Sequence, residues 1–120
     1  MRGTGKHMKN TLECLKNLIT NIYMKKLKAK YLKWKTSNEH YERVAYAQHT
    51  GEWEFLKTDK EYSNRLEYAE HTGEWEHLRN DKNHYNRRRY AEHTGDYEFM
   101  KTDENEENRE AYEEHARMFE

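Results

Sequence analysis

The apolar residues near the start of the chain follow a helical spacing. Within residues 8–29, one series recurs at steps of three, four and three: Leu12, Leu15, Ile19 and Ile22. This is the spacing of a helix packing seam, and the lysines of the segment lie elsewhere. The pattern predicts a basic amphipathic helix over 8–29, after a disordered tail over 1–7. We expect its seam to pack on the rest of the chain and supply much of the aliphatic core.

From residue 30 onward the chain repeats itself every 22 residues. The block Tyr-Ala-Gln-His-Thr-Gly-Glu-Trp-Glu at 46–54 returns almost unchanged at 68–76 and 90–98. Three polar residue types keep the same step: Arg43, Arg65, Arg87 and Arg109; Asp59, Asp81 and Asp103; Asn64, Asn86 and Asn108. The predicted units are 30–51, 52–73, 74–95 and 96–117, followed by a tail over 118–120. The last unit lacks Thr-Gly, and terminal repeats are commonly degenerate in this way.

The composition of the unit favours helix over strand. Strong helix formers dominate it, and valine and isoleucine are nearly missing after residue 22. Thr-Gly occurs once in each of the first three units, where a helix C-terminus would use glycine. On a helical projection Trp53, Tyr68 and His71 share one stripe with Leu56 and Asn64. We therefore predict a single-domain, all-α protein whose repeats present one common aromatic face.

Three arrangements of the repeats fit the pattern. In the first, the helix ends at each Thr-Gly and the units form an up-and-down bundle or a short α-solenoid. In the second, one helix runs through, because 22 residues in six turns is about the period of a right-handed supercoil. In the third, a further break at Thr58-Asp59 starts a second short helix. We favour ends at Thr-Gly, because the three pairs recur at a fixed step.

The units differ on a second face of the projected helix. In 52–73 that face is mostly apolar: Phe55, Tyr62, Leu66 and Ala69. The same places in 74–95 hold His77, His84, Arg88 and Ala91, and in 96–117 three of the four are glutamates. We expect the unit 52–73 to be sandwiched between neighbours, and the next two units to expose this face to water.

Composition and charge narrow the picture further. The aliphatic residues and phenylalanine are scarce, but ten Tyr and three Trp predict an aromatic, partly polar core. Residues 1–36 have a net charge of +9, and residues 37–120 have a net charge of −10. Cys14 is the one cysteine, so no intrachain disulfide can form. With neither a transmembrane stretch nor a signal-peptide pattern, we expect a cytoplasmic protein.

The sequence favours a binding role over catalysis. Neither Ser37 nor Ser63 lies in a nucleophile motif, and no phosphate-binding loop occurs, so we expect a non-enzymatic protein without a cofactor. The main hypothesis is a helical-repeat scaffold for protein interaction or self-assembly into a homo-oligomer. Aromatic anchors dominate interfaces, and the predicted ones are Tyr31, Trp53, Trp75, Tyr97, Tyr46, Tyr68 and Tyr90.

An alternative hypothesis is nucleic-acid binding by the basic N-terminal part. Lysines alternate there with an aromatic ring that could stack on bases: Lys25, Lys26, Lys28, Lys30, Lys33, Trp34 and Lys35. An anionic membrane surface is a weaker candidate partner for the same helix, and we regard membrane binding as unlikely.

Histidine also recurs at the same step as the repeat, at His49, His71 and His93. A ladder of identical histidines could hold a metal ion, but close His or Cys pairs are missing. We therefore predict no metal site. We expect each histidine to cap the end of a helix beside Thr-Gly.

Two short motifs resemble known families. His-Thr-Gly-Glu at 49–52 and 71–74 resembles the linker between zinc fingers, but the paired cysteines and the finger period are absent. Gly95-Asp96-Tyr97-Glu98 resembles the opening of a tetratricopeptide helix, although that family repeats every 34 residues. The second resemblance implies stacked helices and no particular partner, and neither assigns the chain to a family.

Overall fold

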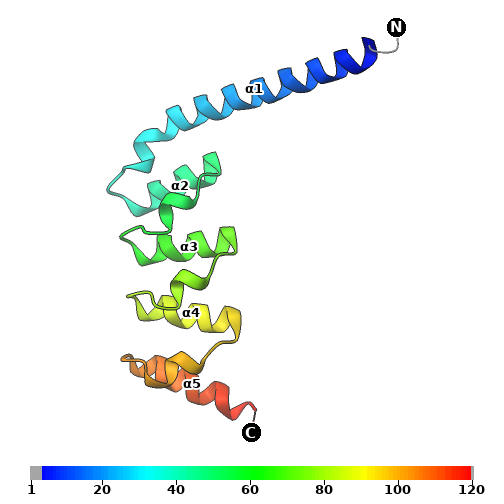
Figure 1. The fold of residues 1–120 in the computed structure, drawn as a ribbon. Coiled ribbons are helices and arrows are strands. Elements are labelled where there is room, and N and C mark those ends of the chain that lie inside the picture. Colours follow the sequence, from blue (N-terminus) through cyan, green and yellow to red (C-terminus); the bar gives the residue numbers. More distant parts are fainter. Residues whose placement is uncertain (1–3, 120) are drawn as a thin grey trace. The chain divides into compact units, whose positions relative to one another are not determined.

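The computed structural model describes the backbone of residues 4–119 and the side chains of residues 10–119. Over that range the chain is all-helical, as predicted (Figure 1). Its elements in order are α1 (Thr4–Lys35), α2 (His40–Thr50), η1 (Glu54–Leu56), α3 (Tyr62–Thr72), η2 (Glu76–Leu78), α4 (His84–Thr94), η3 (Glu98–Thr102) and α5 (Glu106–Arg117), where η marks a 3-10 helix. Parts of both predicted tails, residues 1–3 and 120, lie outside the described residues.

The chain divides into two compact units, Met1–Glu52 and Trp53–Glu120, and each is described by itself. In the first unit, α1 runs through Lys35, well beyond the predicted end at residue 29, and α2 packs on its C-terminal part. The rings of Tyr31 and His49 stack with centroids 4.7 Å apart and planes 14° apart. This contact joins the last turns of the two helices.

A network of polar side chains joins α1, α2 and the residue Glu52 in the first unit. Lys35 Nζ donates a 2.7 Å hydrogen bond to Glu52 Oε1, and the Tyr46 hydroxyl donates a 2.6 Å bond to Glu52 Oε2. Burial and the neighbouring Glu52 carboxylate raise the pKa of Tyr46 to about 12. The hydrogen bonds from Lys35 and Tyr46 hold the pKa of Glu52 below its ordinary value. The buried phenol is thus neutral and hydrogen-bonded at neutral pH.

The apolar seam of α1 does not form part of the core, so the expectation that it packs on the rest of the chain is wrong. Its side chains are between 46% and 65% exposed: Leu12, Leu15, Ile19 and Ile22. The half-buried apolar side chains of α1 follow another face, roughly 120° around the helix at 100° per residue: Met24, Leu27, Tyr31 and Trp34. Because α2 covers this second face through His49, the seam stays open.

Each of α2, α3 and α4 ends at Thr-Gly through the same two contacts. The glycines Gly51, Gly73 and Gly95 have φ angles of 75°, 78° and 79°, in the left-handed region that disfavours a side chain. Each glycine N–H donates to the carbonyl of an alanine four residues earlier. The threonine hydroxyl donates to the carbonyl four residues before it and accepts from the N–H two residues after it, as at Thr72. A helix running through Thr-Gly is therefore excluded.

The break at Thr58-Asp59, one of the three alternatives, is also present. A 3-10 turn, η1, precedes it, and α3 begins only at Tyr62. Asp59 does not cap that helix, because its carboxylate accepts the N–H of Glu61 two residues on. In one continuous helix Trp53 and His71 would lie about 27 Å apart, at 1.5 Å per residue. Their rings are 3.9 Å apart because the chain folds back between them.

Within the second unit α3, α4 and α5 lie side by side in succession (Figure 1). They run parallel, because the start of each helix contacts the start of the one before it. Asn86 Nδ2 in α4 donates to the carbonyl of Tyr62, the first residue of α3, at 2.9 Å. Asn108 in α5 makes the same bond to His84, the first residue of α4, at 3.0 Å. An antiparallel up-and-down bundle of these helices is therefore excluded.

The core of the second unit is small and partly aromatic. The fully buried apolar side chains are Leu56, Tyr68, Ala69, Leu78, Ala91 and Met100. The expectation that 74–95 turns its second face wholly to water is wrong, because Ala91 is fully buried and His77 is half-buried. The projection behind that expectation assumed one unbroken helix, whereas η2 and α4 meet their neighbours from different directions.

Arginine–aspartate pairs with little solvent exposure join α3 and α4 to the loops that follow them. Arg65 in α3 donates through Nε and Nη2 to both carboxylate oxygens of Asp81, at 2.7 and 2.9 Å. Arg87 in α4 binds Asp103 in the same two-bond geometry, at 2.8 and 3.0 Å. Burial alone would raise the pKa of Asp81, but bonds from Arg65 and from the Asn83 N–H outweigh it and hold that pKa below its ordinary value.

Replacing Asp81 should test how much the fold depends on these pairs. The Arg65 and Asp81 side chains are 8% and 4% exposed, so Asp81→Asn leaves an unmatched buried charge, which costs about 3 kcal/mol. The matched control is Asp96→Asn, since Asp96 pairs with Arg79 at 3.5 Å but both side chains are about two-fifths exposed. We expect the control to cost under about 1 kcal/mol in urea unfolding. Equal losses for the two variants would contradict this role.

The same pair gives a defined dependence of stability on pH. Because the pKa of Asp81 is lower in the folded chain than its ordinary value of 3.8, the stabilisation is complete above about pH 4. It is lost as the pH falls further, through the folded pKa. We therefore expect the stability gap between the wild type and Asp81→Asn to narrow below pH 4 and stay constant from pH 5 to 7.

Candidate functional site

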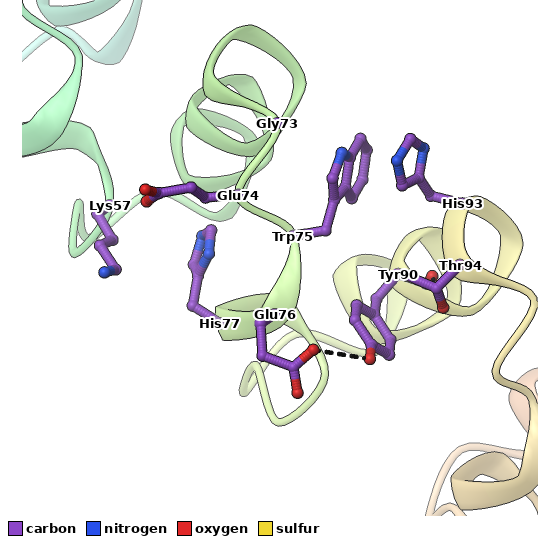
Figure 2. Close-up of a pocket in the computed structure, with 9 residues that line it drawn as sticks. All are labelled: Lys57, Gly73, Glu74, Trp75, Glu76, His77, Tyr90, His93 and Thr94. Atoms are coloured by element: carbon purple, nitrogen blue, oxygen red, sulfur yellow. Dashed lines mark hydrogen bonds between the residues drawn. The ribbon is translucent and has the colours of Figure 1, made fainter.

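A groove of about 580 Å³ lies in the second unit between the segment around η2 and the C-terminal half of α4 (Figure 2). Its walls carry aromatic, charged and imidazole side chains together. The lining residues are Lys57, Gly73, Glu74, Trp75, Glu76, His77, Tyr90, His93 and Thr94. The volume of the groove lies in the range of about 300–1,000 Å³ that ligand pockets of proteins commonly have.

One wall of the groove is a tryptophan–histidine stack. The rings of Trp75 and His93 lie face to face, with centroids 4.1 Å apart and planes 15° apart (Figure 2). Trp75 is held there because the left-handed Gly73 ends α3 and turns the chain back along α4. Its indole is only 8% exposed, whereas His93 is exposed. The stack thus offers a partner the imidazole and the ring edges.

The floor contains a buried phenol bonded to a carboxylate. The Tyr90 hydroxyl donates to Glu76 Oε2 at 3.0 Å, and burial, with help from Glu76, raises the pKa of Tyr90 above its ordinary value (Figure 2). The Tyr68 hydroxyl lies in the same way between Glu54 and Glu74 and donates to one carboxylate at a time. Glu74 and Glu76 are otherwise exposed, so the groove keeps negative charge at its rim.

His77 is the unusual member of the lining. Among the described residues both of its ring nitrogens are buried without a hydrogen-bond partner, and the ring meets Tyr68 edge-on at 5.2 Å. The equivalent positions one unit before and after hold Phe55 and Phe99. Phe99 packs against Tyr90 with the same edge-on geometry. A polar ring therefore replaces an apolar one in this groove.

A second groove repeats the first one, a single repeat further along the chain. It holds about 250 Å³ and is lined by Gly95, Asp96, Tyr97, Glu98, Tyr112, His115 and Ala116. Each of these residues occupies the position in its repeat that a lining residue of the larger groove occupies in the repeat before. The rings of Tyr97 and His115 stack at 3.9 Å, like Trp75 and His93. The groove is therefore a recurring feature of the second unit.

The predicted aromatic anchors are brought together, but mostly inside the units. Tyr46, Tyr68 and Tyr90 are at most 5% exposed, and their hydroxyls bind glutamates. The remaining predicted rings each stack on a histidine near the end of the following α-helix: Tyr31, Trp53, Trp75 and Tyr97. Of these four rings only Trp75 is buried. The common face is thus largely an internal contact surface, because the broken helix turns it onto its neighbours.

The predicted histidines stack on these rings and do not cap the helices. The ring of His71 lies 3.9 Å from Trp53, and its Nε2 lies 3.1 Å from Glu67. The final carbonyls of α2, α3 and α4 are bound by glycine N–H groups and threonine hydroxyls instead. Within residues 10–119 no group of three or more His, Cys, Asp or Glu side chains is placed to hold a metal ion.

The candidate nucleic-acid residues lie on the C-terminal third of α1. Lys25, Lys26, Lys28, Lys30 and Lys33 are exposed. Two of the predicted lysines meet the carboxylate of Glu52: Lys35 at 2.7 Å and Lys28 at 3.8 Å. The Trp34 ring is half-buried and packs against both rings of the Tyr31–His49 stack, which limits the surface that it can offer to a base.

Sequence reasoning missed Glu76 and His77 as members of a site. The available signal was the change from Phe to His at one position of an otherwise regular repeat, at residues 55, 77 and 99. No described helix has both the length and the apolar character that crossing a membrane requires. Comparisons with protein-family models, with curated proteins and with solved structures gave no match.

Replacing His77 by phenylalanine should stabilise the protein. A buried polar group without a partner costs about 1–3 kcal/mol, and the repeat already accommodates phenylalanine at this position. We expect His77→Phe to raise the free energy of unfolding by about 1 kcal/mol in a denaturant titration. The matched control is Phe99→His, which should lower it. Destabilisation by His77→Phe would show that the histidine has a structural partner.

Proposed function

We propose that the chain is a non-enzymatic scaffold that binds polypeptides, built from four 22-residue helical repeats over residues 30–117 stacked as a short α-solenoid. The regular spacing supports this arrangement, since α2, α3, α4 and α5 begin one repeat length apart, at positions 40, 62, 84 and 106. The parallel packing of α3, α4 and α5, repeated by Asn86 and Asn108, supports it as well. Stacked repeats of this kind use their extended surfaces for binding.

The observation that carries the proposal is the recurrence of the groove. Two hollows with equivalent linings follow each other along the stack, each with an aromatic–histidine wall and an acidic rim. A polypeptide running along the helices could occupy both in turn, whereas an enzyme needs one site of defined geometry. The absence of any nucleophile or phosphate-binding motif from the sequence agrees with a non-enzymatic role.

The groove chemistry suits a segment that offers N–H donors or a basic side chain. Glu74 and Glu76 offer acceptor oxygens, and one ring nitrogen of His77 can accept a hydrogen bond while the other donates. The imidazole of His93 can pack on an apolar side chain. The exposed seam of α1 supports a further protein contact. Exposed apolar surface of this kind marks interaction sites, and it is the basis for proposing self-assembly beside peptide binding.

A peptide selected on the purified protein would test the groove. We expect a random 12-residue peptide library displayed on phage to yield binders, and His93→Ala to weaken a selected synthetic peptide about tenfold or more in fluorescence anisotropy. The matched control is Arg89→Ala on the same helix. Its side chain pairs with Glu70 and Glu92 and lines neither groove, so this change should alter the affinity less than twofold. Thermal unfolding of both variants shows whether each is folded at the assay temperature. Equal peptide affinity of the His93→Ala variant and the wild type would contradict binding in the groove.

Nucleic-acid binding is the second proposal, and one observation favours it. Lys25, Lys26 and Lys33 are exposed, and no described carboxylate lies within ion-pair distance of them. Three cations on one helix could follow a phosphate backbone, although Trp34 adds little stacking surface.

Salt dependence separates this proposal from peptide binding. If the lysines bind phosphates, the affinity for a fluorescent 20-nucleotide single strand should fall steeply, by about tenfold or more, between 50 and 200 mM salt. The double variant Lys25→Gln and Lys26→Gln should reduce both the affinity and the salt slope. Lys57→Gln, in the groove, is the control and should leave them unchanged. An affinity that does not respond to salt would remove the second proposal.

A further inference from the structure

Three arginines of α3, α4 and α5 are held in the same way by one hydrogen bond each. In every case Nη1 donates to the backbone carbonyl six residues earlier: Arg65 to Asp59 at 2.7 Å, Arg87 to Asp81 at 2.7 Å, and Arg109 to Asp103 at 2.6 Å. This bond fixes the plane of the guanidinium group. The other edge of each group, Nε and Nη2, is thereby aimed at the next element of the stack.

In Arg65 and Arg87, the donors Nε and Nη2 are both occupied by a carboxylate. Asp81 and Asp103 accept both donors of Arg65 and Arg87 respectively, with all four distances between 2.7 and 3.0 Å. Among the described residues, Nε and Nη2 of Arg109 have no such partner, and its side chain is only half-buried. Arg109 is therefore a preorganised receptor for a carboxylate, in the two-bond geometry that guanidinium groups favour.

Other groups on the same side of α5 match this open edge. Glu106, the first residue of α5, holds the position that Tyr62 and His84 hold in α3 and α4, where each carbonyl accepts from an asparagine of the next helix. Glu114 corresponds to Glu70, which pairs with Arg89 of the next helix at 3.6 Å. Phe119 stands one repeat length after Tyr97 and is 76% exposed. In earlier repeats the equivalents of these groups contact the following helix, whereas Phe119 packs against His115 of α5 itself, with ring centroids 5.0 Å apart.

We propose that this surface of α5 binds a basic helical segment of another protein. The segment carries an aspartate for Arg109, and an asparagine five residues later for the Glu106 carbonyl. The spacing is that of Asp81 to Asn86 and of Asp103 to Asn108 within this chain. A basic segment is favoured because α5 is strongly acidic, with glutamates at Glu106, Glu107, Glu110, Glu113 and Glu114.

A second copy of this chain does not supply such a segment. Its aspartates and asparagines at the required spacing already have contacts within their own chain: Asp59, Asn64, Asp81, Asn86, Asp103 and Asn108. At the equivalent positions of the first repeat, Ser37 and Glu42 stand where aspartate and asparagine are needed. The surface is also distinct from the two grooves, so this inference goes beyond the proposed groove function and can fail without it.

The test uses the full-length protein and a labelled peptide with the sequence of residues 76–95. This peptide contains Asp81 and Asn86 at the required spacing, and it carries a net positive charge. We expect saturable binding in fluorescence anisotropy. We expect Asp81→Asn in the peptide, or Arg109→Gln in the protein, to weaken binding about tenfold or more. The two changes combined should cost little more than either alone, because both remove the same contact.

Non-specific electrostatic attraction predicts the opposite change in affinity for these two substitutions. Both substitutions increase the charge difference between the peptide and α5, so simple electrostatics would tighten binding. Arg109→Lys keeps the charge without the two-bond geometry and should still weaken binding several-fold, whereas Arg117→Gln on the same helix should change it less than twofold. Tighter or unchanged binding with the Asp81→Asn peptide would overturn the proposal, as would no saturation below about 1 mM. Loss of binding in His93→Ala but not in Arg109→Gln would also overturn it, because it places the peptide in the groove.

Discussion

The buried pairing of an arginine with the aspartate sixteen residues later is the contact on which the second unit depends. One guanidinium group joins three parts of the chain: its own helix, the loop before that helix through Nη1, and the next loop through Nε and Nη2. Because the planar guanidinium group makes both hydrogen bonds only when the carboxylate lies in one orientation, the pair fixes the spacing and the angle between successive helices. Asp81 also accepts the N–H of Asn83, so the same carboxylate positions the start of α4.

This polar scaffold compensates for a scarcity of aliphatic residues. Leu56, Leu78 and Met100 fill one equivalent site in successive repeats, and beside them the core consists of alanines and aromatic rings. Each buried tyrosine needs an acceptor for its hydroxyl, which the glutamates after Thr-Gly or at the start of the 3-10 turns provide. The acidic residues that give residues 37–120 their negative charge are thus partly internal partners.

The sequence predicted the helical class and the helix ends at Thr-Gly, because glycine acts locally, and it offered the break at Thr58-Asp59 only as one of three alternatives. It did not predict which faces are buried. A projection with one fixed period assumes an unbroken helix, and the turn between Leu56 and Tyr62 reverses the chain. For the same reason the sequence did not predict the groove, since Trp75 and His93 stack only because the chain reverses. The repeated Arg, Asp and Asn were visible as a pattern, but their pairing across sixteen and twenty-four residues requires the three-dimensional arrangement.

Differences between the repeats are more informative about binding than their similarities. In α3 and α4 the positions that stay constant, such as Arg65 and Tyr68 with Arg87 and Tyr90, are occupied by internal contacts and leave little surface for a partner. The positions that vary face the hollows: residue 77 is histidine between two phenylalanines, and residue 88 is arginine where α5 has glutamate. Each such change alters the charge or polarity of one hollow without disturbing the Arg–Asp framework. A stack built on a fixed polar framework can therefore vary the chemistry of its hollows one repeat at a time.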